Sequence, residues 1–158
     1  MNATPDGALL DKARALIAQE SGLAVVVTCR ADRTPHASVV NAGVLDHPVN
    51  ATTIVGFVAR GHARKLDNIR ARPDVTIVWR IGWEWVAVDG RSQLVGPNDH
   101  IDGLTPADLP RLLRSVYAAA VGGTEGDWAS LDEEMAHEGH TAVLITPTRI
   151  YSNPQALS

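Results

Sequence analysis

Short connections between successive β-branched, apolar runs constrain the fold of this chain most strongly. The runs at 23–30 and 35–45 are joined only by Ala-Asp-Arg-Thr, and a third run at 51–59 follows the loop Asp-His-Pro-Val-Asn. Connections this short join antiparallel strands, whereas parallel strands need a crossover of about a dozen residues or more. The regular strand-helix alternation of a doubly wound parallel sheet is also absent. The sequence therefore predicts a mainly β (α+β) fold, a small antiparallel barrel with peripheral helices.

The remaining elements fit around such a barrel. Further strands are predicted at 75–81, 83–95 and 141–154, and the last of these ranges holds one or two strands. Within 83–95, Asp89-Gly90 permits either a hairpin turn or a bulge in one long strand. Apolar residues at helical spacing predict helices at 5–20, from about 62 to Pro73, at 107–123 and at 127–139. Thr4 is the predicted cap of the first helix.

Composition narrows the class of protein. The 158 residues predict one domain, 1–158, with 45% hydrophobic residues and a formal net charge of -4. The acidic balance argues against a partner among nucleic acids. The sequence offers no apolar window long enough for a membrane span and no signal peptide, so we expect no membrane association. The lone Cys29 cannot form an internal disulfide and fits a reducing cytosol, so a cytoplasmic location is expected.

Residues 56–75, GFVARGHARKLDNIRARPDV, concentrate positive charge in this acidic chain. Beside His62, they hold five of the fourteen Lys and Arg residues: Arg60, Arg64, Lys65, Arg70 and Arg72. Gly61 lets a ligand approach the backbone closely. The start of the predicted helix offers unpaired N–H groups, where cations oppose the helix dipole unless an anion binds. The three cations near this helix start, Arg60, Arg64 and Lys65, therefore predict an anion site. Arg70 and Arg72 suit the other helix end, where a solvated face explains them as well.

Two further patterns leave alternatives open. On the strand PHASVVNAG, His36 and Ser38 share one face and Asn41 lies on the other. The face with His36 and Ser38 either contacts a ligand or faces solvent. WRIGWEW places three of the four tryptophans within seven residues, which indicates a packed core, a dimer surface or a stacking wall for a flat ring. HEGH at 137–140 lacks the spacing of a zinc motif, so no metal site is predicted. The phosphate-binding loops GxGxxG and GxxxxGK[ST] are absent.

Together, GLAVVVTCRADRTPHASVVNAG, GHARKLDNIRARPDVTIVW, WVAVDGRSQLV and ITPTRIYSNP resemble the pyridoxamine-5'-phosphate-oxidase-like family of FMN-binding split β-barrels. The similarity covers nearly the whole chain. Within this family, the chain resembles most specifically the actinobacterial members that use the deazaflavin coenzyme F420. The most specific parts are Lys-x-x-Asn-Ile-Arg-x-x-Pro at 65–73 and the strand VAVDGRSQL. The resemblance implies a homodimer with two cofactor sites at the subunit interface.

The resemblance also implies which residues contact the cofactor. Its anionic part would lie over the segment from 60 to 65, with Lys65 as the phosphate-binding lysine, while Trp83 would approach from the partner chain. The complete set of predicted cofactor-binding residues is His36, Ser38, Asn41, Arg60, Gly61, His62, Ala63, Arg64, Lys65, Trp83 and Arg149. No catalytic residue is predicted, and His36 and Tyr151 are candidates for proton delivery.

The implied function is an F420H2-dependent oxidoreductase that reduces a small unsaturated organic substrate. The run of basic residues favours the long polyanionic tail of F420 over the single phosphate of FMN. An FMN-dependent oxidoreductase of the pyridoxamine-phosphate-oxidase class and a non-catalytic F420 carrier are the alternatives.

Overall fold

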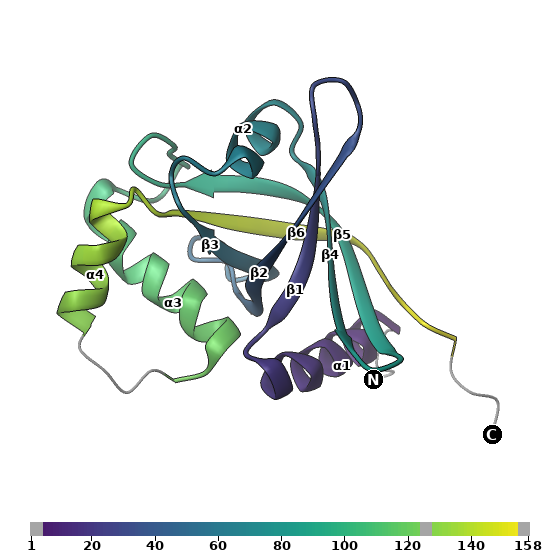
Figure 1. The fold of residues 1–158 in the computed structure, drawn as a ribbon. Coiled ribbons are helices and arrows are strands. Elements are labelled where there is room, and N and C mark those ends of the chain that lie inside the picture. The colour runs from purple at the N-terminus through teal and green to yellow at the C-terminus, as the bar shows by residue number, and fades with distance from the viewer. Residues whose placement is uncertain (1–4, 124–127, 155–158) are drawn as a thin grey trace.

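The fold was analysed in a computed structural model that describes residues 5–123 and 128–154. Within these residues, strands close into an antiparallel barrel in the order β1-β2-β3-β6-β5-β4 (Figure 1). The predicted fold class is therefore confirmed. The strands are β1 (Leu23–Cys29), β2 (Pro35–Asp46), β3 (Thr53–Ala59), β4 (Asp74–Ile81), β5 (Glu84–Val95) and β6 (Thr141–Ser152).

The alternatives left open at the two long strands are now decided. β5 is one continuous strand, and its register against β6 shifts between Asp89 and Gly90, so this pair forms a bulge and not a hairpin turn. Residues 141–152 form the single strand β6. The prediction that Trp83 belongs to a strand was wrong, because the chain turns at Gly82, whose φ is 59°, and β5 begins only at Glu84.

The barrel interior is filled by the inward-facing residues of all six strands, among them Phe57, Ile77 and Trp79. Trp79 is 1% exposed, and its indole N–H donates to the carbonyl oxygen of Ala42 at 3.0 Å. The packed-core interpretation therefore holds for this tryptophan. A buried indole needs such a partner, since an unsatisfied N–H in an apolar interior is unfavourable.

Helices cover the barrel at its ends and on one side (Figure 1). They are α1 (Pro5–Glu20), α2 (Arg64–Ala71), α3 (Leu109–Val121), preceded by a 3₁₀ turn (Pro106–Asp108), and α4 (Trp128–His137). Helix α3 packs against β2 at Gly43, where a Cβ atom would overlap the backbone of Ala119. The predicted cap Thr4 and the predicted helical residue Asp127 lie outside the described residues. No helix in the described parts of the chain has the length and apolarity to cross a membrane.

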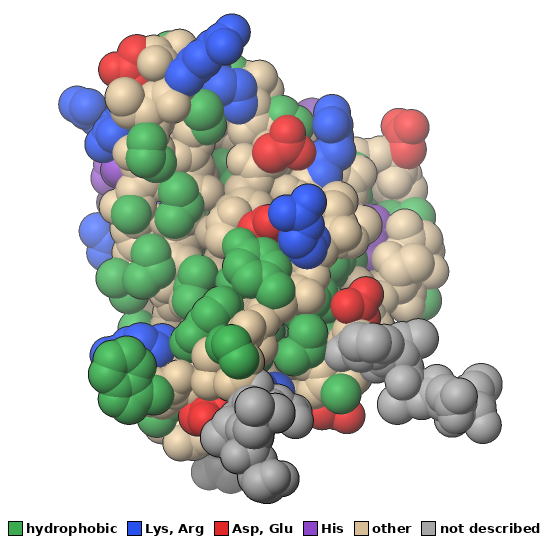
Figure 2. All heavy atoms as spheres, turned by 90° about the vertical axis from the view of Figure 1, so that its right-hand side faces the viewer, with side chains coloured by type: hydrophobic (Ala, Val, Ile, Leu, Met, Phe, Trp, Pro, Cys, Tyr) green, Lys and Arg blue, Asp and Glu red, His purple; other side chains and the backbone are tan. Residues whose placement is uncertain are grey.

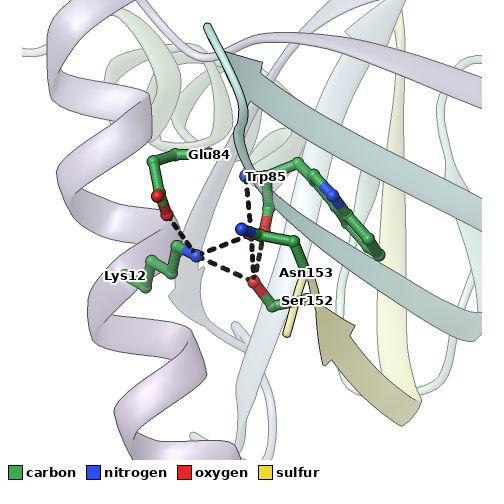
Figure 3. Close-up of polar contacts among 5 residues, drawn as sticks. All are labelled: Lys12, Glu84, Trp85, Ser152 and Asn153. Carbon is green, nitrogen blue, oxygen red and sulfur yellow. Dashed lines mark hydrogen bonds and ion pairs between the residues drawn. The ribbon is translucent and has the colours of Figure 1, made fainter. Parts of the chain in front are cut away.

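A polar cluster joins α1 to the strands at the end of the barrel opposite α2 (Figure 3). Lys12 Nζ lies 2.6 Å from a carboxylate oxygen of Glu84, and donates to Ser152 Oγ at 2.9 Å and to Asn153 Oδ1 at 3.0 Å. Ser152 Oγ in turn donates to the carbonyl oxygen of Trp85 at 2.5 Å. The cluster fixes the start of β5, next to the turn that carries Trp83, against α1, because Lys12 bonds both the start of β5 and the end of β6.

Candidate functional site

One candidate site lies where β2 faces α2. Asn68 of α2 donates from its side-chain amide to Thr28 Oγ1 at 3.0 Å and lies 3.4 Å from Nδ1 of His36. His36 and Ser38 point to the same side of β2, because alternate residues of a strand share a face. Lys65 precedes Asn68 by three residues and therefore lies on the same side of α2. Strand and helix thus bring His36, Ser38 and Lys65 to one region.

Ser38 has an unsatisfied hydroxyl group. Its Oγ is buried and has no hydrogen-bond partner among the described residues. Leaving a buried hydroxyl unpaired costs about 1–3 kcal/mol, so such groups usually have a partner in the functional state. A bound ligand with a hydrogen-bonding group would remove this penalty.

Lys65 stands apart among the cations of the basic run. Its side chain is half-buried, and burial lowers the pKa of the amine below the ordinary value of 10.5. In the described residues no carboxylate lies within salt-bridge distance of its Nζ. A desolvated, unpaired ammonium group is unfavourable by itself and becomes favourable when an anion binds.

The first turn of α2 adds further donors. The helix begins at Arg64 and not near His62, because Ala63 has an extended backbone (φ −65°, ψ 133°) and its N–H bonds the carbonyl oxygen of Arg60 at 3.0 Å. Ala63, at the cap position, supplies no side-chain hydrogen bond to the helix. The N-terminus of α2 therefore carries uncapped N–H groups and the positive end of the dipole beside Lys65. His62 and Arg64 are exposed there.

Arg60 and Gly61 contact the segment that joins α4 to β6. The guanidinium Nε of Arg60 lies 3.1 Å from Oε2 of Glu138, and the N–H of Gly61 donates to the carbonyl oxygen of Glu138 at 3.2 Å. A Cβ atom on Gly61 would lie 2.6 Å from the carbonyl oxygen of Gly139. This glycine is thus needed for the close approach of two protein segments, a role that the sequence interpretation missed.

The two other basic residues of the run are engaged elsewhere. Arg70 pairs with Asp67 at 3.0 Å and with Asp99 at 2.7 Å, and Arg72 donates to the carbonyl oxygen of Cys29 at 2.7 Å. Both guanidinium groups make contacts within the protein, so we do not count either among the charges of the candidate site that await an anion. This agrees with the expectation that these two residues need no ligand.

Three predicted residues lie apart from this region. Asn41 is on the opposite face of β2 and donates to the carbonyl oxygen of Ser21 at 2.8 Å. Trp83, 92% exposed, occupies the turn between β4 and β5. The eight residues of β4 separate that turn from the α2 end of the strand, a distance of about 25 Å at roughly 3.3 Å per residue. Trp83 and Lys65 of one chain therefore cannot contact the same small ring.

Arg149 lies instead in a polar cluster around Asp89 on the outside of the barrel. The carboxylate of Asp89 accepts hydrogen bonds from Thr76 Oγ1 at 2.7 Å and from the Tyr151 hydroxyl at 2.9 Å, and Arg149 Nη1 is 3.9 Å away. Partial burial and this hydrogen bond raise the pKa of Tyr151. A cavity of about 380 Å³ adjoins the cluster and includes Asp89 and Thr76 in its wall. Sequence reasoning missed Asp89, although a carboxylate within an apolar strand was a signal for it.

Apolar side chains cover the same side of the barrel (Figure 2). The strand registers align Val39, Val25, Val78, Ala87 and Tyr151 in one row across five strands. We call this row, with the neighbouring Leu23, the outer apolar face. Val39 is 66% exposed and Leu23 46% exposed, which is unusual for large side chains in the middle of a sheet.

The fold defines a class: antiparallel split β-barrel proteins with peripheral helices. Residues 9–153 match the family of Pyridoxamine 5'-phosphate oxidase, and the chain belongs to that family. Because the match covers most of the chain, barrel and site region both fall within it. The predicted family is therefore confirmed.

Solved structures with the same fold share little sequence with the chain. A conserved hypothetical protein of Mycobacterium tuberculosis has a TM-score of 0.67 at 18% identity, covering 94% of this chain and 84% of its own. A structure named F420 reductase has a TM-score of 0.57 at 14% identity, with 87% and 94% covered. An FMN-binding protein of Nostoc punctiforme has a TM-score of 0.56 at 15% identity, and the match covers 96% of this chain and 86% of that protein. No curated protein matches the chain. Identities this low establish the fold alone.

Proposed function

We propose that the protein is an oxidoreductase that binds coenzyme F420 and uses its reduced form, F420H2, to reduce a small unsaturated organic substrate. The observation that carries the proposal is the half-buried Lys65, which has no carboxylate partner in the described residues, together with the unsatisfied hydroxyl of Ser38, which shares its strand face with His36, the neighbour of Asn68 in α2. An anionic, hydrogen-bonding ligand would satisfy both groups at once. Family membership supports a flavin-type coenzyme as that ligand.

The residues present fit the charge of such a coenzyme. Its phosphate would bind Lys65 and the uncapped N–H groups of α2, with Arg64 beside them, because a helix N-terminus and a lysine both favour an anion. Ser38 and His36 would contact the part of the coenzyme next to the ring. The bound deazaflavin supplies the hydride chemistry, while the protein binds, orients and shields the reactants.

We propose further that the functional unit is a homodimer formed through the outer apolar face. A second copy would cover Leu23, Val25 and Val39, which water otherwise contacts. Trp83 and Arg149 would then serve the site of the partner subunit, as the distance between Trp83 and Lys65 requires. The lone Cys29 supports a cytoplasmic location for this dimer.

An FMN-dependent oxidoreductase is the second candidate, and the contact between Arg60 and Glu138 favours it. Because this carboxylate already neutralises Arg60, fewer cations remain for a long polyanionic tail, and Lys65 with Arg64 suffices for one phosphate. A third possibility is a carrier that binds F420 without turnover. It is favoured because Tyr151, one of the two candidates for proton delivery, is bonded to Asp89 on the outside of the barrel, so that only His36 remains beside α2.

Titration of the purified protein with F420, FMN and FAD tests the proposal. We expect the tightest binding for F420, followed by oxidation of bound F420H2 when an unsaturated substrate is added. Tightest binding of FMN would transfer the proposal to the second candidate. Tight F420 binding with no turnover on a panel of enones and nitroaromatics would favour the carrier. Failure of all three coenzymes to bind would refute the site.

A further inference from the structure

We propose that Glu138 is a specificity-determining residue that limits how much negative charge the anion site accepts. Its carboxylate neutralises Arg60, so that ligands with many negative charges bind less tightly than the basic run alone would allow. The inference rests on the proposed anion site at Lys65 and goes beyond it, because Glu138 lies about seventy residues away in the sequence, on a different structural segment.

The carboxylate is held beside Arg60 by the backbone and not only by its own charge. The carbonyl oxygen of Glu138 accepts a hydrogen bond from the N–H of Gly61 at 3.2 Å, and Gly139 packs directly on Gly61. The N–H of Glu138 donates to the carbonyl oxygen of Glu134 at 3.1 Å, which fixes the residue to the end of α4. Because main-chain contacts join Gly61 to the Glu138–Gly139 segment, the negative charge of Glu138 is fixed beside Arg60.

The other neighbours of Glu138 leave Arg60 as its main cation. His140 Nε2 lies 3.6 Å from the same carboxylate oxygen, but His140 Nδ1 lies 3.2 Å from the carbonyl oxygen of Met135. A carbonyl only accepts hydrogen bonds, so Nδ1 donates to Met135, while Nε2 lies farther from the carboxylate of Glu138 than the guanidinium Nε of Arg60 does, at 3.6 Å against 3.1 Å. The side chain of Arg60 is 62% exposed and that of Glu138 28%, so the carboxylate is the more covered member of the pair.

The effect on a ligand depends on the length of its charged part. A single phosphate bound at Lys65 and the first turn of α2 would be five residues along the chain from Arg60, and screening would weaken the effect of Glu138 on it. A longer anion that extends to Arg60 must share this guanidinium with Glu138 or displace it. An exposed ion pair stabilises by up to about 1 kcal/mol, so removing the competing carboxylate should tighten a long anion by about two- to fivefold.

The test compares inorganic phosphate with tripolyphosphate by isothermal titration calorimetry on the full chain. In Glu138→Gln, which keeps the shape and loses the charge, tripolyphosphate should bind about two- to fivefold more tightly, and phosphate should change less. The matched control is Glu133→Gln, which removes an exposed charge from α4, the helix just before Glu138, and should alter neither affinity. Melting temperatures check that both variants fold. High salt should reduce the gain in Glu138→Gln.

Lys65→Ala, measured beside these variants, separates this inference from the proposed function. Unchanged or weaker tripolyphosphate binding in Glu138→Gln, together with weaker binding in Lys65→Ala, overturns the role of Glu138 and leaves the anion site standing. Tighter binding in Glu138→Gln with no effect of Lys65→Ala refutes the site at Lys65 and, with it, the role proposed for Glu138. Affinities that neither variant changes overturn both, and so does an equal gain in Glu133→Gln.

Discussion

Replacing Lys65 by alanine should weaken coenzyme binding far more than replacing Arg70, although each change removes one positive charge from the same short helix. Lys65 is half-buried with no carboxylate partner in the described residues, so its contact with a bound anion is charge-assisted and poorly screened. Loss of such a contact costs about 1.5–3 kcal/mol, or roughly a 10- to 150-fold loss in affinity. Arg70 is already neutralised by Asp67 and Asp99, so Arg70→Ala should change affinity by less than about twofold.

Fluorescence titration with F420 at low and high salt measures both variants. Arg70→Ala should lower the melting temperature, because it leaves Asp99 partly buried and unpaired, and its affinity is therefore measured well below that temperature. The deficit in Lys65→Ala should persist at high salt, since a close contact is screened less than a distant charge. Equal losses in the two variants that both vanish with salt would refute the site and leave only a diffuse positive patch.

Three further predictions concern Lys65, the outer apolar face and Tyr151. Anion affinity should fall as pH rises through the pKa of Lys65, which burial places below 10.5, and Lys65→Arg should remove this fall because guanidinium stays charged; a titration with tripolyphosphate from neutral to alkaline pH measures it. Val25→Asp, on the outer apolar face, should convert a dimer into a monomer by light scattering, whereas a wild-type monomer at micromolar concentration would contradict the shared site. Wild-type stability should decrease as pH rises from 10 through the raised pKa of Tyr151, and thermal melts of Tyr151→Phe should lack that decrease.

The fold was predictable from the sequence because its determinants are local. The short turns fix antiparallel pairing, and apolar spacing predicts α1 over 5–20, where the structure has it. The bulge at Asp89 was not decidable, because Asp-Gly suits both a turn and a bulge, and the choice depends on pairing with β6, which lies about sixty residues further along. The turn at Gly82 falls between the two predicted strands, but the second strand was predicted to begin one residue early, at Trp83, because strand ends are set by cross-strand partners.

The candidate site was predictable only in part, because charge can be counted from sequence whereas pairing cannot. Five cations in one run appear equivalent, yet the structure commits Arg70 and Arg72 to protein contacts and Arg60 to Glu138. Lys65 differs from them by burial and because no carboxylate of the described residues pairs with it, and both depend on how α2 packs against the barrel. The placement of cofactor contacts on these residues stays a prediction, and the titrations above test it.

Geometry requires a second chain if the predicted contacts are to form one site. Lys65 and Trp83 lie near opposite ends of β4, so no movement of side chains alone can bring them to one ring. The outer apolar face lies between these ends, and its exposed valines favour association with another copy. A two-fold axis that lies in this face and runs perpendicular to β4 would reverse the direction of β4 in the second copy and bring its Trp83 end toward Lys65 of the first. Trp83→Ala should therefore weaken F420 binding while leaving the dimer intact by light scattering.

In mixed dimers of Trp83→Ala with Lys65→Ala, one site should retain both residues and bind with wild-type affinity. Mixed dimers that bind only with the reduced affinities of the two parent variants would show that Trp83 and Lys65 do not act across the interface.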